Sequence, residues 1–159
     1  MKTKTVFEIL LSRRDTLAGI AASGAAWLLG LPNDAFASPA DAKQKIQELT
    51  GSANPQKARV TVELPDITDQ GPLTPIRIVV DSPMTATDYV KEIHIVAERN
   101  TVPEVASFRL GPHNGRAEVT TRIRIRESQI VDVAAVMSDG GVYLGRARCR
   151  VTGGAGGCG

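Results

Sequence analysis

Cysteine, histidine and aromatic residues are scarce in this sequence. Its 159 residues include two cysteines and two histidines, and aromatic side chains make up 4% of the chain. Two cysteines form at most one disulfide, which excludes the dense disulfide framework of many small secreted domains. The motifs G-x-S-x-G, G-x-x-x-x-G-K-[ST], H-E-x-x-H and C-x-x-C are all absent from the sequence. We therefore predict neither an enzyme active site nor a bound cofactor.

The two histidines fall on different predicted elements. His94 lies in an alternating segment, where it shares one face with Glu92, and His113 lies in a loop rich in glycine and proline. A metal site needs several ligands that converge on one point. We therefore expect His94 to be a surface residue of a strand and His113 to be a turn residue. Two histidines on separate elements disfavour a metal-binding or electron-transfer module.

A hydrophobic run long enough to cross a bilayer is also missing from the N-terminus. The apolar stretch at 19–31 is shorter than the roughly 20 residues of a membrane helix. It follows a basic start with Arg13 and Arg14 and precedes an Ala-x-Ala cleavage site, an order typical of secretory signals. The arginine pair resembles that of twin-arginine (Tat) signals. We predict an export signal at 1–37, removed after Ala37, and a periplasmic protein; an N-terminal membrane anchor is the alternative.

The remaining chain has almost no net charge. From Ser38 onward, 15 lysines and arginines stand against 14 aspartates and glutamates. A near-neutral domain lacks the basic excess that nucleic acids and anionic membranes attract. We therefore expect neither as a partner of the mature protein, whose length suits one domain.

Period-two alternation dominates the mature sequence after one helical segment. Apolar residues at helical spacing predict a short amphipathic helix at 39–49. The turn signal Asp139-Gly140-Gly141 predicts a tight hairpin between two apolar runs. The predicted strands lie at 59–64, 76–80, 89–98, 119–126, 129–137 and 142–151. Six or seven such strands, separated by proline and glycine, indicate an antiparallel β-sandwich at 38–151.

The C-terminal segment 152–159 differs in composition from the sandwich. Glycine-rich chains are flexible coils, so this segment is predicted to be a mobile arm that presents the Cys158 thiol to solvent. Such an arm suits a covalently carried cargo, with Cys158 as the attachment point. The alternatives are a frayed terminus, a bridge to Cys149 and a disulfide across a homodimer. The small residues that give the arm its flexibility are Gly153, Gly154, Ala155, Gly156, Gly157 and Gly159.

The second thiol lies in the last predicted strand. Alternation places Cys149 on the same face as Tyr143 and Val151, opposite the arginines. Cysteine often behaves as a small buried hydrophobic residue. We interpret Cys149 as a core residue, while a bridge to the arm stays geometrically open.

Arginine recurs at every second position in two predicted strands. These sets are Arg122, Arg124 and Arg126, and Arg146, Arg148 and Arg150. Each set should line one strand face, and a solvated face paired with carboxylates such as Glu118 or Asp132 is the favoured interpretation. The alternative is a positive surface that attracts an acidic partner or anionic sulfur compounds.

The sequence resembles the SoxY family, the sulfur carriers of the Sox thiosulfate-oxidation system. The resemblance covers nearly the whole mature chain and includes the glycine–cysteine tail. The segments that carry it are 81–85, 88–95, 103–106, 115–124, 133–140 and 153–159. It implies an immunoglobulin-like β-sandwich and places the carrier cysteine at Cys158.

The resemblance also implies partners. It implies a heterodimer with a SoxZ-like subunit, oxidative coupling of thiosulfate to Cys158 by the cytochrome SoxAX, and release of sulfate by the hydrolase SoxB. Where SoxCD is present, it would oxidise the sulfur that remains attached. The protein would then be a substrate-carrying subunit and not an enzyme. The alternative is an exported structural domain whose C-terminal thiol forms a disulfide within the chain or between chains.

Overall fold

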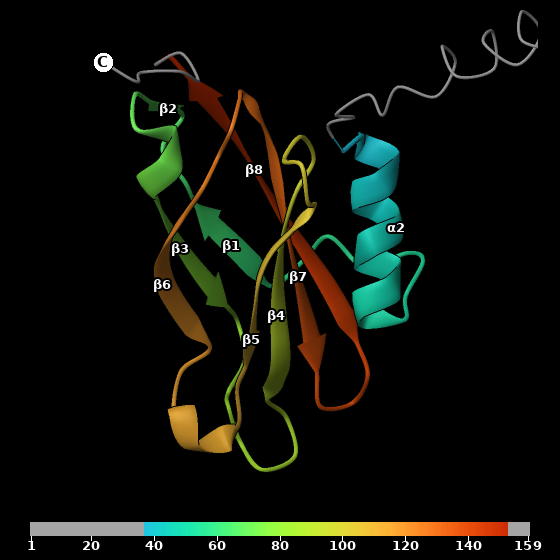
Figure 1. Cartoon of the computed structure of the whole chain (residues 1–159). Helices are drawn as coiled ribbons and strands as arrows, with labels where there is room; N and C mark the ends of the chain where they lie inside the picture. Colours follow the sequence, from blue (N-terminus) through green and yellow to red (C-terminus); the bar gives the residue numbers. More distant parts are fainter. Residues whose placement is uncertain (1–36, 153–159) are drawn as a thin grey trace, which may run out of the picture. The chain divides into compact units, whose positions relative to one another are not determined.

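The computed structural model describes residues 37–152. Residues 1–36, with Arg13 and Arg14, and residues 153–159, with Cys158, lie outside the described residues. One helix, α2 (Pro39–Thr50), precedes eight strands and two short 3₁₀ helices in the described chain (Figure 1). The strands are β1 (Val60–Glu63), β2 (Ile67–Thr68), β3 (Thr74–Val80), β4 (Val90–Ala97), β5 (Glu104–Arg109), β6 (Glu118–Ile123), β7 (Gln129–Met137) and β8 (Val142–Val151), with η2 (Gly71–Leu73) and η3 (Pro112–Asn114) between them.

The strands form two sheets. One has the order β1-β3-β6, and the other has the order β2-β8-β7-β4-β5. All neighbouring strands are antiparallel except the short pair β2 and β8, which is parallel. The predicted β-sandwich with a short N-terminal helix is confirmed, with this one parallel pair as an addition.

The core lies between the sheets and follows the alternation of the strands. In β7, Val131 and Val133 belong to the inter-sheet core, whereas Ala134 belongs to a second cluster on the outer face. Ile93 and Ile95 of β4 are fully buried in the same core as Val131. Burying a side chain of this size contributes about 1.5–3 kcal/mol, so these positions are a major source of stability.

Helix α2 begins and ends at capping residues. Ser38 and Asp41 form a capping box, in which the Ser38 amide donates to Asp41 Oδ2 at 2.8 Å and the Asp41 amide donates to Ser38 Oγ at 3.3 Å. Gly51 ends the helix with a φ of 71°. The buried Ala42 and Ile46 pack against the outer face of the larger sheet, so the helix hides an apolar area that the sandwich would otherwise expose.

Two strands were not predicted, and one is shorter than expected. β5 is an edge strand without clear burial alternation, and β2 has only two residues. β6 ends at Ile123 because the next residues form hydrogen bonds with loops. The Ile125 amide donates to the Gly71 carbonyl, and the Asn100 side-chain amide donates to the Arg124 carbonyl. Loop contacts, which strand periodicity does not reveal, replace the ladder after Ile123.

Candidate functional site: the arm-root end of the sandwich

The last strand is anchored up to the residue where the predicted arm begins. The Arg150 amide donates to the Asp66 carbonyl at 2.8 Å, and the Thr152 amide donates to the Thr68 carbonyl at 2.9 Å. Between them, the Val151 amide donates to Ser128 Oγ at 3.0 Å. We call this end, formed by the end of β8, β2, η2 and the β4–β5 loop, the arm-root end; Figure 1 shows it at the top.

Cys149 lies in the core close to this end. Its side chain is fully buried and belongs to the inter-sheet cluster, so the interpretation of Cys149 as a core residue is confirmed. Burial raises the pKa of the Cys149 thiol, and the Asp66 carboxylate raises it further. A buried thiol with a raised pKa reacts slowly, because the thiolate is the nucleophile.

The arginines of β8 lie on the outer face of the sheet. Arg146 forms an ion pair with the buried Asp132 at 2.6 Å, which confirms one predicted partner. Glu118, the other predicted partner, instead pairs with Arg77 of β3 at 2.8 Å. The other predicted set, Arg122, Arg124 and Arg126, does not line one strand face, because β6 ends at Ile123.

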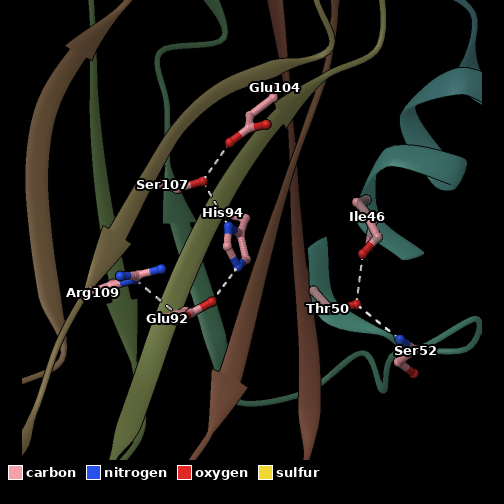
Figure 2. A network of polar contacts seen from close by, with 8 residues as sticks. All are labelled: Ile46, Thr50, Ser52, Glu92, His94, Glu104, Ser107 and Arg109. Carbon is pink, nitrogen blue, oxygen red and sulfur yellow. Dashed lines mark hydrogen bonds and ion pairs between the residues drawn. The ribbon is translucent and has the colours of Figure 1, made fainter. Parts of the chain in front are cut away.

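His94 is buried, contrary to the prediction of a surface residue. Its Nδ1 lies 2.8 Å from Ser107 Oγ, and the Ser107 hydroxyl donates to Glu104 at 2.8 Å (Figure 2). Its Nε2 lies 3.3 Å from the Glu92 carboxylate but makes no hydrogen bond. The alternation placed His94 on the correct face of β4, the face on which α2 packs against Val96, and β5 places Ser107 directly beside the imidazole. His113 is exposed in η3, as predicted for a turn residue.

Metal ligands do not converge within residues 37–152. No group of three or more His, Cys, Asp or Glu residues in this part of the chain could hold a metal ion. The polar contacts of His94 instead link the edge strand β5 to β4, a structural role. In the same part of the chain, no helix is long and apolar enough to cross a membrane.

The family to which the chain belongs follows from its match to a protein-family model. The model described as sulfur oxidation protein SoxY matches residues 46–158, from within α2 to the C-terminal cysteine. The chain belongs to the SoxY family. The match includes every strand of the sandwich and ends at Cys158. No curated protein sequence matches the chain.

Solved structures have the same fold. The sulfur carrier protein SoxY from Chlorobium limicola f. thiosulfatophilum is 24% identical, with a TM-score of 0.61 over 72% of this chain and 99% of that one. A superoxide reductase (neelaredoxin) from Ignicoccus hospitalis is 14% identical, with a TM-score of 0.53 over 73% and 94%. At these identities the likeness supports the shared sandwich architecture alone.

Proposed function

We propose that this SoxY family member is a covalent sulfur carrier that holds thiosulfate-derived sulfur on Cys158. The observation that supports this most strongly is the extent of the family match, which continues beyond the sandwich through the glycine-rich segment to Cys158. Cys149, the only other thiol, is buried in the core and is poorly placed to carry a cargo. The sulfur carrier protein SoxY from Chlorobium limicola f. thiosulfatophilum has the same fold.

The proposed chemistry begins with oxidative coupling. Cys158 loses its proton, its sulfur bonds to the outer sulfur of thiosulfate, and two electrons leave as Cys–S–S–SO₃⁻ forms. A SoxAX-type cytochrome accepts these electrons. In the next step, a SoxB-type hydrolase adds water, so that sulfate and two protons leave and the persulfide Cys–S–S⁻ stays on the arm. A SoxCD-type enzyme, where present, then oxidises that bound sulfur.

The partners must supply the catalytic groups in this scheme. Segment 152–159 contains no side chain that could act as a general base, and an ordinary cysteine thiol has a pKa near 8.5. The sandwich contributes a fixed root for the arm at Thr152, held by Thr68. We further propose export to the periplasm by the twin-arginine signal at 1–37 and association with a SoxZ-like subunit. The glycines at 153–157 and 159 would keep the arm flexible.

Mass spectrometry of the C-terminal tryptic peptide, without reduction, tests this proposal. Cleavage after Arg150 releases Val151–Gly159, which contains Cys158 and excludes Cys149. After incubation with thiosulfate and the partner enzymes, we expect thiosulfonate and persulfide adducts on this peptide. Cys158→Ser should abolish them, and Cys149→Ala, the matched control, should retain them. A peptide found only in disulfide linkage would instead indicate a structural thiol.

A further inference from the structure

The exposed large apolar side chains of the described chain gather at one end of the sandwich. Ile67, Leu73 and Val102 are 56%, 59% and 64% exposed, and no other large apolar residue within 37–152 is comparably exposed. They come from three separate segments, namely β2, η2 and the β4–β5 loop. Their gathering is therefore a property of the fold and not of one apolar run in the sequence.

Hydrogen bonds join these segments around the root of the arm. Ile67 pairs with Arg150 in the β2–β8 ladder. The carbonyl of the next residue, Thr68, accepts a hydrogen bond from the Thr152 amide. In η2, which ends at Leu73, the Gly71 carbonyl accepts a hydrogen bond from the Ile125 amide. The loop of Val102 is tied to the same region, because Asn100 donates to the Arg124 carbonyl at 2.9 Å. The three apolar residues therefore belong to segments held at the same end of the sandwich as Thr152, the last described residue before 153–159.

Arginines line a hollow at the same end of the sandwich, while the exposed carboxylates Asp66 and Asp69 flank β2. A hollow of about 340 Å³ opens beside the end of β8 and is lined by Arg99, Arg148 and Arg150. Its carboxylate, Glu98, is buried and lies 3.6 Å from Arg146, and Arg99 pairs with Glu127 at 3.4 Å, so the positive balance of the hollow comes from Arg148 and Arg150. Apolar residues beside exposed arginines are the composition that protein interfaces favour.

We propose that the arm-root end is a docking surface for the enzymes that act on Cys158-bound sulfur. This inference rests on the proposed carrier function. The partner surface that fits is an apolar patch beside carboxylates, placed around the opening to the active site. Ile67 and Leu73 would contact the patch, and Arg148 and Arg150 would meet the carboxylates.

The length of the arm supports this partner over others. Cys158 follows Thr152 by six residues, so at full extension it reaches roughly 20 Å from the sandwich. The deeper the reacting atoms lie below the surface of an enzyme, the closer the arm-root end must come to the rim of the opening for Cys158 to reach them. A weak, reversible contact also suits a carrier that must leave one enzyme for the next.

Steady-state kinetics of sulfur loading test the docking surface. The substrate is the carrier as purified with its companion subunit, and the enzyme is the loading cytochrome of the same organism. Ile67→Glu and Leu73→Glu should raise the KM for the carrier about tenfold or more, with little change in kcat. Ile67→Lys should raise the KM less than Ile67→Glu does, because a positive charge suits an acidic partner surface. Ala86→Asp, at an exposed position in the loop at the opposite end, is the matched control.

The outcomes separate this proposal from the carrier function. Loss of loading in Cys158→Ser, together with unchanged KM values in Ile67→Glu and Leu73→Glu, would overturn the docking surface and leave the carrier function in place. Dissociation of the companion subunit from the Glu variants would also overturn it, because the end would then be a subunit interface. Loading that survives Cys158→Ser would overturn both. A small thiol reagent should modify Cys158 equally fast in the wild type and all docking variants.

Discussion

The Arg146 guanidinium of β8 donates two hydrogen bonds to the buried carboxylate of Asp132 on β7. Nε donates to Oδ1 at 2.6 Å, and Nη2 donates to Oδ2 at 2.9 Å. The Asp132 side chain is 1% exposed, whereas that of Arg146 is 41% exposed. The two residues are direct partners in the β7–β8 ladder. The pair is therefore asymmetric, because water can solvate the guanidinium but not the carboxylate if the contact is broken.

This asymmetry predicts the order of two stability losses. Arg146→Ala leaves a buried carboxylate without its charged partner and should lower the free energy of unfolding by about 2–3 kcal/mol. Asp132→Asn leaves an arginine that can turn to water and should cost about 1 kcal/mol. Urea denaturation at neutral pH measures both. Arg148→Ala, on the same face of β8, is the control and should change stability by less than about 0.5 kcal/mol. Equal losses for the first two variants would contradict the argument.

The position of this pair could be predicted from the sequence, and the arm-root end could not. The turn at Asp139-Gly140-Gly141 fixes the register of β7 and β8, and Gly140 has the positive φ of 85° that such a turn requires. Local alternation also placed Cys149 in the core. By contrast, Ile67, Leu73 and Val102 meet only through contacts between distant segments.

Other departures from prediction have the same physical origin. Alternation identified the strand face of His94 but not the elements that bury it. β5 was missed because an edge strand is held by one neighbour and needs no strict apolar periodicity. Glu118 pairs across the smaller sheet with Arg77, a choice of partner set by the register of β3 and β6. Non-local pairing of this kind is not encoded in a local pattern.

Gly145 marks a point where the two sheets come too close for a side chain. A Cβ atom there would lie 2.6 Å from Val60 Cγ1 and 2.8 Å from the Val60 carbonyl oxygen. A side chain can move aside, but the backbone oxygen of β1 cannot without shifting the strand. We expect Gly145→Ala to lower the free energy of unfolding by about 1–3 kcal/mol in chemical denaturation.

The matched control for this substitution is Gly111→Ala. Nothing lies within 4 Å of a Cβ built at Gly111, and its φ of −154° suits any residue. This variant should unfold at nearly the wild-type denaturant concentration. If Gly145→Ala were equally harmless, the sheets would be able to separate at this edge without cost.

The buried Cys149 thiol should make stability fall at alkaline pH. Its folded-state pKa is raised by burial and by Asp66, whereas in the unfolded chain it titrates near 8.5. The unfolded chain therefore loses this proton first, so the stabilisation present below about pH 8.5 decreases as the pH rises. In a Cys158→Ser background, Cys149→Ala should flatten the decline in urea midpoint between about pH 8 and 10. Parallel declines with and without Cys149 would contradict this prediction.

The capping box of α2 bears on where the export signal is removed. Ser38, the residue after the predicted cleavage point, is the N-cap, and the helix begins at Pro39. Cleavage after Ala37 would remove a hydrogen bond from the Ala37 amide to the Asn100 carbonyl at 3.2 Å. In return, the Ser38 nitrogen that donates to Asp41 would become a charged ammonium group. We predict that the exported protein begins at Ser38, which intact mass and N-terminal sequencing will check.

The contact between Ser38 and Asp41 also predicts how the stability of the protein depends on pH in the acid range. Backbone and side-chain hydrogen bonds from Ser38 hold the pKa of Asp41 below its usual range. A depressed carboxyl pKa gives stability that is present above the unfolded pKa near 4 and is lost as the pH falls further. Asp41→Asn should therefore lose stability at neutral pH and differ little from the wild type near pH 3 or below. The neutral-pH loss should be larger in the cleaved protein than in the precursor, because only the cleaved chain has the charged donor. An equal loss in both forms would show that the ammonium group at Ser38 does not strengthen the cap.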